Sequence, residues 1–512
     1  MSLARAIGRN AGFTAIGRIV TLIVWIAMTP RILAALGPER FGLWSILLAV
    51  SGSLATIDLG LGVAVSRFAA ELAGHRRLPE IRRLVGKAFA VQAGLTVLLV
   101  VPALAMRDPI LERFRVPTAW MDEARPAFLY AMLAFGVGMV ANLLTGALQG
   151  VQRMELAAAI SLPAAVALLA GILAATRAPE PLVALFLVQL AYNGLMVIGM
   201  ALALLSVTRR APGILGAVVQ AAPVDLSLRR VLGLSSWLQL TSLFALAQNN
   251  LDKFLLGALV SLARVGDYEI AWRASYFAYL LPIFFLSALL PAAAAREATH
   301  GLEARLALYR RALEPYLWCV LGLTGLLIAL APSLLEAWIG HAPPGAVFML
   351  RCVAIAQAAS LGTGIASTAA RAGDRAGLES AYVGMAVLLH LGLSYAGWRA
   401  WGWPGIPIGF AAAAVLSAVW FVARVDRWLG VVPLAESLRT ALPAFGVSAV
   451  AGLAATAVAA APFGVAPGRA HGLIALIAAG GAYVLVGWIV VVTLFPWQGR
   501  ALEDRVRSLT RA

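Results

Sequence analysis

Long apolar runs separated by short polar stretches occupy almost the whole chain. Each run reaches the roughly 20 residues that an α-helix needs to cross a bilayer core of about 30 Å. The strict alternation that a membrane β-strand of about 10 residues would show is absent. We therefore predict an all-α polytopic membrane protein with about 14 transmembrane helices. The expected spans are residues 12–36, 42–65, 86–106, 126–149, 155–176, 181–207, 232–256, 266–290, 314–336, 345–369, 378–398, 404–423, 440–461 and 472–495.

The longest polar and turn-rich stretch in mid-chain, residues 206–230, follows the sixth span. Internal similarity supports a division there, because LARAIG at residues 3–8 resembles LRRVLG at 228–233. A glycine follows each segment at nearly the same distance, Gly42 in the first half and Gly266 in the second. We infer two pseudo-symmetric six-helix lobes, a plan typical of secondary transporters that bind substrate between their repeats.

A second internal similarity relates the ends of the fourth and tenth spans, GALQGVQR at 146–153 and GIASTAARAGD at 364–374. The last two spans lie outside the repeat. The expected organisation is an N-terminal six-helix lobe, a cytoplasmic linker, a C-terminal six-helix lobe, and two additional helices with a cytoplasmic tail. These parts correspond to residues 1–207, 208–230, 231–425 and 426–512.

Composition and charge agree with a membrane location. The chain is 62% hydrophobic and 12% charged, a ratio that a water-soluble globule could not bury. Its net charge of +16 is explained by the enrichment of Lys and Arg in cytoplasmic loops, without a nucleic-acid partner. If the N-terminus is cytoplasmic, 27 of the 40 basic residues fall on that side, which predicts two cytoplasmic termini and an even number of spans. The first apolar run is too long for a signal peptide, so we expect a retained helix.

Sequence motifs for enzymatic chemistry are missing. No Walker A, H-E-x-x-H, G-x-S-x-G or C-x-x-C pattern occurs, and Cys319 and Cys352 have no paired spacing. The longest outer loop, residues 107–125, is too short to fold as a catalytic domain. We expect a transporter without cofactor or metal site, apart from a possible coupling ion, H⁺ or Na⁺.

Ionisable residues inside spans each need a physical reason, because insertion at the bilayer centre costs roughly 2.5–3.5 kcal/mol. Those near predicted span ends, Arg67, Asp267 and Glu269, can extend to water. His390 stands on an apolar face and is interpreted as a core histidine. Arg18 and Arg31 of the first span are separated by about 20 Å along a helix and cannot occupy one depth. Both are candidates for residues that line a water-filled cavity.

The segment FALAQNNLDKFLLGAL at residues 244–259 carries a polar stripe, Asn249, Asn250, Asp252 and Lys253, within an otherwise lipid-soluble helix. Such a stripe must face protein or water. It could hold neighbouring helices together by hydrogen bonds. Alternatively, it could form one wall of a translocation path, with Asp252 binding a coupling cation or proton.

Short motifs in both halves resemble the polysaccharide-transport flippases of the multidrug/oligosaccharidyl-lipid/polysaccharide exporter superfamily, which includes O-antigen flippases. The motifs are LGPERFGLWSI at 36–46, IDLGLGVAVSRF at 57–68, GALQGVQR at 146–153, LDKFLLG at 251–257 and VGDYEIAWR at 265–273. The resemblance implies two lobes that move undecaprenyl-diphosphate-linked glycan across the bacterial inner membrane by alternating access, for O-antigen or exopolysaccharide synthesis. It also implies cationic cavity residues, which map onto Arg18, Arg31 and Arg273.

The full set of candidate cavity residues is Arg18, Arg31, Asp58, Arg67, Asn142, Gln149, Asn249, Asn250, Lys253 and Arg273, with Asp252 as the ion-coupling candidate. Arginine suits a diphosphate because its planar fork donates two hydrogen bonds to one anion. The expected partners are the lipid-linked glycan, membrane lipids, and a polysaccharide polymerase and chain-length regulator, around a monomeric transport unit.

Three alternatives stay open. A lipid II or multidrug exporter would share the fold, although a cation-drug exporter would want more acids in the N-terminal lobe than Asp58. A membrane polysaccharide polymerase or ligase would need a longer outer loop. A structural scaffold would not need buried ionisable residues.

Overall fold

The computed structural model describes residues 3–55, 61–75, 77–209, 248, 250–372, 375–430, 435–461 and 463–495. Within these ranges all regular secondary structure is helical, and 11 helices are long and apolar enough to cross a membrane. The chain divides into two compact units, Met1–Gly266 and Asp267–Ala512. The prediction of an all-α polytopic fold is confirmed. The division lies beyond the predicted linker at 208–230, most of which is outside the described residues.

The difference between 11 and about 14 spans has a structural cause. The expected second and eighth spans lie in helices that each contain two crossings, while most of the seventh, residues 232–256, is outside the described part. The remaining spans correspond one to one with the expected ones.

Helix α1 (Leu3–Ala55) folds back on itself at Gly37. Gly37 has a φ of +70°, a conformation that glycine adopts readily, and Pro38 follows it. The rings of Trp25 and Trp44 are 5.8 Å apart. Nineteen residues would separate them by about 28 Å in a straight helix. The element is therefore a helical hairpin that supplies two spans.

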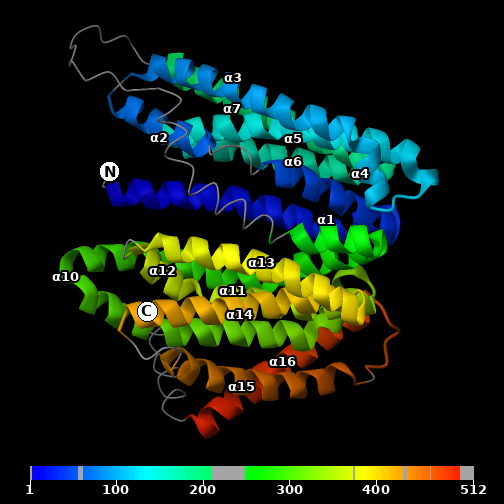
Figure 1. Ribbon diagram of the computed structural model, residues 1–512, viewed down its shortest axis with the longest axis vertical. Helices are drawn as coiled ribbons and strands as arrows, with labels where there is room; N and C mark the ends of the chain where they lie inside the picture. Colours follow the sequence, from blue (N-terminus) through cyan, green and yellow to red (C-terminus); the bar gives the residue numbers. More distant parts are fainter. Residues whose placement is uncertain are drawn as a thin grey trace. The chain divides into compact units, whose positions relative to one another are not determined.

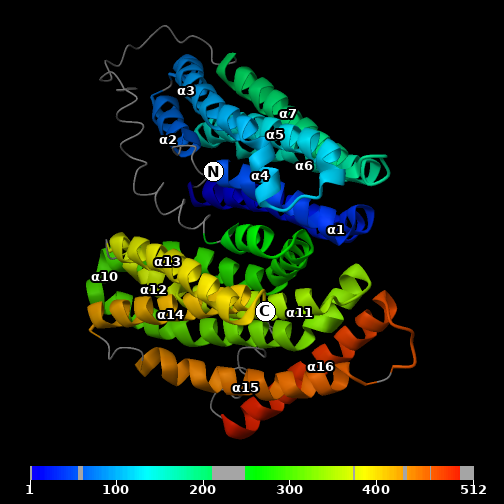
Figure 2. The same cartoon turned by 45° about the vertical axis from the view of Figure 1, so that its right-hand side comes forward.

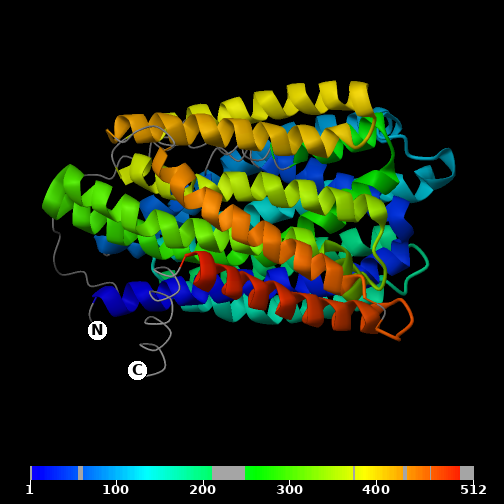
Figure 3. The same ribbon diagram turned by 90° about the horizontal axis from the view of Figure 1, so that it is seen from below.

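Helix α10 (Leu262–Ile339) is a second hairpin (Figure 1). Its 78 residues would extend about 115 Å if straight. Instead, the rings of Phe277 and Trp338 are 6.2 Å apart, and those of Phe285 and Tyr316 are 5.6 Å apart. Aromatic contacts thus pair the two halves side by side, as Figure 3 also shows.

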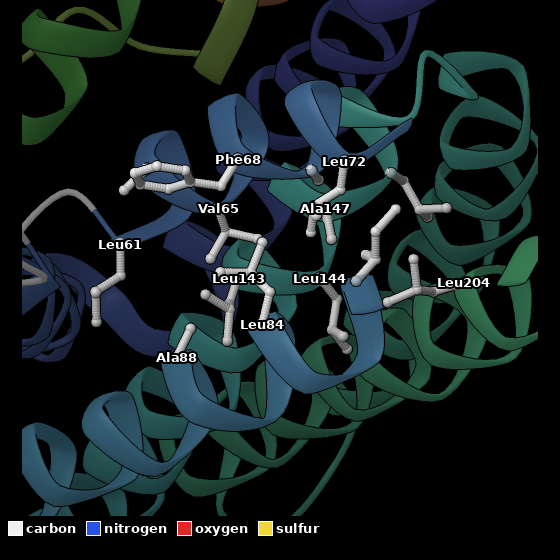
Figure 4. Close-up of a cluster of buried hydrophobic side chains, with 14 of the residues drawn as sticks. Leu61, Val65, Phe68, Leu72, Leu84, Ala88, Leu143, Leu144, Ala147 and Leu204 are labelled. Atoms are coloured by element: carbon white, nitrogen blue, oxygen red, sulfur yellow. The ribbon is translucent and has the colours of Figure 1, made fainter. Parts of the chain in front are cut away.

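Unit 1 is built around a central helix, α5. The other elements after α1 are α2 (Leu61–Gly74), α3 (Leu78–Ala105), α4 (Arg107–Arg113), η1 (Thr118–Trp120), α5 (Met121–Gly150), α6 (Met154–Ala175) and α7 (Pro181–Arg209). Apolar side chains from α2, α3, α5 and α7 form one cluster, labelled in part in Figure 4. The backbones of α2 and α5 are in close contact, because added Cβ atoms at Gly146 and Gly150 would overlap the carbonyl oxygens of Gly62 and Ser66.

The connection between α3 and α5 is held by arginines. Asp108 accepts hydrogen bonds from Arg107 and Arg125, and these lower the pKa of its carboxyl group. Arg113 and Arg115 donate to the backbone carbonyls of Ala258 and Val260, at 3.2 and 3.1 Å. Those carbonyls lie at the C-terminal end of helix 250–259, where a cation is favoured by the helix dipole.

The two repeat-related glycines meet within unit 1. A Cβ at Gly42 would overlap the carbonyl oxygen of Leu262 and lie 3.2 Å from the nitrogen of Gly266. A Cβ at Gly266 would lie 2.6 Å from the carbonyl oxygen of Pro38. The start of α10 therefore crosses α1 backbone to backbone, and only glycine fits at the crossing.

Unit 2 continues with α11 (Pro344–Gly362), α12 (Gly364–Ala372), α13 (Ala376–Trp401), α14 (Gly405–Trp428), α15 (Ala435–Ala459) and α16 (Arg469–Leu494). Helices α13 and α14 lie side by side (Figure 2), with Gly397 and Gly405 in backbone contact. His390 is fully buried between them and stacks on Phe410 at 4.6 Å. It is a core residue, as expected.

The two C-terminal helices pack against each other and against the second half of α10 (Figure 3). The seam is made of small residues, with Gly452 close to Ala329 and Gly325 close to Ser448. At one end Glu336 of α10 accepts a hydrogen bond of 2.7 Å from the Gly468 amide, and His471 Nδ1 lies 3.0 Å from its other oxygen.

The glycine crossing yields a stability prediction. Gly42→Ala should destabilise the protein by about 1–3 kcal/mol or more, because the added methyl group has no space. The matched control is Gly52→Ala on the same helix, where a Cβ would meet nothing within 4 Å. Thermal unfolding in detergent should show a lower Tm for Gly42→Ala alone. Equal Tm values for the two variants would contradict the close crossing.

Candidate functional site

A polar stripe runs along α5 in unit 1. Asn142 is exposed, while Thr145 and Gln149 are half-buried, and the spacing of three and four residues puts them on one helix face. Asn142 is level with Gly62 of α2, and Gln149 precedes Gly150, which contacts Ser66.

Arg67 of α2 follows Ser66 and is exposed. It has no ion pair among the residues that the structure describes. Arg67, Asn142 and Gln149 therefore each lie at or next to a backbone contact between α2 and α5. The region of these contacts, with these three residues, is called the α2–α5 surface below.

The first helix contributes a second exposed cation. Arg31 lies on α1 about two turns before the Gly37 bend, is exposed, and has no ion pair within the described ranges. The backbone of Arg18 is helical, but its side chain lies outside the described part. Asp58 and Asn249 also lie outside the described residues. Arg31 is thus the one predicted cavity residue on α1 whose side chain the structure places.

The polar stripe of the seventh span is buried inside unit 1. Asp252 has no exposed surface, and Asn250 and Lys253 are each 8% exposed. Gly257, one turn beyond Lys253 on the same face, packs against Ile46 of α1. The stripe is therefore turned toward α1 rather than toward lipid. Burial agrees both with interhelical hydrogen bonding and with a desolvated cation site.

In unit 2, the charge of Arg273 is neutralised by Glu269 on the same helix. Its Nε lies 2.6 Å from Glu269 Oε1, and the two side chains are 11% and 6% exposed. The spacing of four residues places them on adjacent turns. Among the residues that the structure describes, Arg273 thus differs from Arg31 and Arg67 in having a carboxylate partner. An anion bound at Arg273 would have to compete with Glu269.

An aromatic row next to this ion pair was missed from the sequence. Tyr268, Trp272, Tyr276 and Tyr279 follow one another along α10, with successive ring centroids 6.1, 6.5 and 5.9 Å apart. Their spacing of four, four and three residues is a helical stripe that the sequence does contain. Three of the four rings are half-buried, so the row is only partly covered by protein.

The many apolar helices long enough to cross a bilayer define a multi-pass membrane protein. Residues 7–295, more than half of the chain, match the model of the family described as polysaccharide biosynthesis protein. The chain belongs to that family. The resemblance to polysaccharide-transport flippases of this superfamily is confirmed.

Solved structures of transporters share the fold. The lipid II flippase MurJ, in an inward closed conformation, is 11% identical, with a TM-score of 0.66 over 95% of this chain and 99% of its own. An inward-facing multidrug resistance MATE family transporter of the MOP superfamily is 15% identical, with a TM-score of 0.62 over 81% and 94%. A MOP superfamily transporter from Pyrococcus furiosus is 16% identical, with a TM-score of 0.57 over 83% and 95%. No curated protein matches the sequence.

The ion pair in unit 2 yields a second stability prediction. Glu269→Gln should destabilise the protein by about 3–5 kcal/mol, because it leaves the guanidinium of Arg273 buried without its carboxylate. The double variant Glu269→Leu with Arg273→Leu should recover much of that loss. Thermal unfolding of single and double variants in detergent measures the coupling.

The matched contrast is Glu379→Gln, which breaks the pair of Glu379 with the more exposed Arg371. Exposed pairs contribute about 0–1 kcal/mol, so this variant should unfold close to the parent protein. Additive losses from the two substitutions at 269 and 273 would show that the side chains are not energetically coupled.

Proposed function

We propose that the protein is a flippase that moves undecaprenyl-diphosphate-linked oligosaccharide from the cytoplasmic to the periplasmic leaflet, for O-antigen or exopolysaccharide synthesis. One observation carries the proposal: Arg31, in a membrane-spanning helix, and Arg67 of α2, just beyond the expected end of the second span, are exposed cations of unit 1 without ion pairs in the described part of the chain. Membership of a polysaccharide biosynthesis family supports the choice of cargo.

The chemistry of the cargo fits these residues. A diphosphate leaving water loses its hydration, and charge-assisted hydrogen bonds from arginine replace part of it. The amide groups of Asn142 and Gln149 on the α2–α5 surface can donate to phosphate or sugar oxygens and accept from sugar hydroxyls. Alternating access between the two units would carry the headgroup while the polyprenyl chain stays in lipid.

The structure also bears on the alternatives. A lipid II or multidrug exporter is supported by the fold of MurJ and of the MATE transporters alone. A polymerase or ligase would need reactive side chains in the connection between α3 and α5. There, Arg107, Arg113, Arg115 and Arg125 all hydrogen-bond to Asp108 or to backbone carbonyls. The family match favours the glycan-lipid cargo over these.

The same proposal assigns a location, partners and a coupling site. The protein would span the bacterial inner membrane with both termini cytoplasmic, as a monomeric transport unit beside a polysaccharide polymerase and a chain-length regulator. The buried Asp252 is the candidate group for H⁺ or Na⁺ coupling, with no cofactor required.

Arg31→Ala and Arg18→Ala should each slow translocation about tenfold or more, because each removes a charge-assisted hydrogen bond to the diphosphate at a different depth of its path. The measurement is the initial rate at which a lipid-linked oligosaccharide appears in the opposite leaflet of reconstituted vesicles. Arg177→Ala, an exposed arginine in the connection between α6 and α7, is the matched control and should be unaffected. Unchanged rates for Arg31→Ala and Arg18→Ala, or new drug sensitivity in cells, would contradict a cationic glycan-lipid site.

Asp252→Asn should abolish the dependence of transport on an imposed H⁺ or Na⁺ gradient, because the amide cannot take up a proton or balance a cation. The measurement compares rates with and without the gradient in the same vesicles. A gradient response equal to that of the parent protein would assign Asp252 to interhelical hydrogen bonding alone.

A further inference from the structure

Unit 2 contains an apolar cavity of about 700 Å³ that the proposed transport path does not use. Its size is in the range of small-molecule binding pockets, roughly 300–1,000 Å³. The second half of α10 and helices α11, α14 and α15 line it. Exposed side chains of α14 and α15 at its margin include Val419, Phe445 and Leu453. A membrane lipid can therefore reach it from the bilayer.

The cavity exists because α15 rests on α10 and stands away from α14. Small residues at the α10–α15 seam, Gly325, Ala329 and Gly452, allow close approach there. Farther from the seam, helical stripes face one another across the opening. On α11 the stripe is Ile355, Ala358, Ala359 and Gly362; on α15 it is Ala441, Phe445, Ala449 and Leu453. The walls are apolar and suit a hydrocarbon chain.

One cation interrupts this apolar lining. Arg351 of α11 lines the cavity, about 10 Å along the helix from its start at Pro344. Its Nε donates to the backbone carbonyl of Ile328 at 3.3 Å, and no carboxylate pairs with it in the described residues. A guanidinium at this depth needs an anion to balance its charge or water to solvate it. Its remaining N–H groups can donate to a phosphate.

We propose that this cavity is a binding site for one anionic phospholipid of the surrounding bilayer. Its phosphate binds Arg351, and one acyl chain lies between α15 and the α11–α14 wall. The site is separate from the candidate cavity residues of unit 1, so it does not depend on the proposed flippase activity. A bound lipid would fill the opening beside α15 and so stabilise the attachment of the two C-terminal helices.

Charge selects the occupant. A phosphodiester lipid such as phosphatidylglycerol carries one negative charge, which one arginine balances. The diphosphate of a glycan-lipid carries more charge than Arg351 alone could neutralise, and an unpaired charge in low dielectric is unfavourable. A zwitterionic lipid would bring its own cation next to the guanidinium. An anionic phospholipid is therefore favoured over both.

The experiment measures bound lipid on the full-length protein by native mass spectrometry, after incubation with phosphatidylglycerol or phosphatidylcholine. We expect one tightly held phosphatidylglycerol and about tenfold weaker binding by Arg351→Gln. Arg351→Lys should retain part of the affinity. Arg399→Gln, an exposed arginine of α13 outside the cavity, is the matched control and should bind as the parent does.

A second pair of variants tests the cavity itself. Ala449→Phe points a ring into the opening and should abolish lipid retention. Val450→Phe, the neighbouring exposed position on α15 that does not line the cavity, should not. Equal retention of phosphatidylglycerol by Arg351→Gln and the parent would overturn the proposal, as would equal binding of phosphatidylcholine. Displacement of phosphatidylglycerol by equimolar undecaprenyl phosphate would overturn the assignment of the occupant.

Discussion

Lipid offers no hydrogen bonds to a polypeptide, and this constraint governs the whole molecule. Every backbone amide and carbonyl within the bilayer must find its partner inside the protein, and a helix does so locally. The chain therefore reverses direction only where a residue can adopt the turn conformation and the freed backbone groups find hydrogen-bond partners. Gly37 reverses α1 with a positive φ, and arginines satisfy the carbonyls that end helix 250–259. The large helical hairpins follow from the same requirement.

Charges inside the spans are treated in three different ways. Glu269 and Arg273 neutralise each other on one helix. Asp252 and Lys253 are buried within unit 1, against the α1 side. Arg31 and Arg67 are exposed without an ion pair in the described ranges, which leaves these cations, like Arg351 at the apolar cavity of unit 2, available to an external anion.

Much of the fold could be predicted from the sequence because apolar runs of sufficient length are a local property. The candidate site was harder to predict, because an arginine can bind an external anion only if no carboxylate of the protein already pairs with it. The four-residue spacing of Glu269 and Arg273 is compatible with an ion pair on one helix, whereas the resemblance to flippases implies that Arg273 lines the cavity. The cavity around Arg351 could not be anticipated at all, because it results from where α15 fails to touch α14. The similar positions of Gly42 and Gly266 in the two repeats can be recognised in the sequence. Their contact can be seen only in the folded structure.

The seam of glycine and alanine between α10 and α15 has a consequence for how such a protein can evolve. A joint made of small side chains, with Glu336 at one end, requires few specific side chains on α10. A helical pair can be acquired or lost at such a joint by gene fusion or truncation without redesign of the host. The appended pair could then diversify under its own selection.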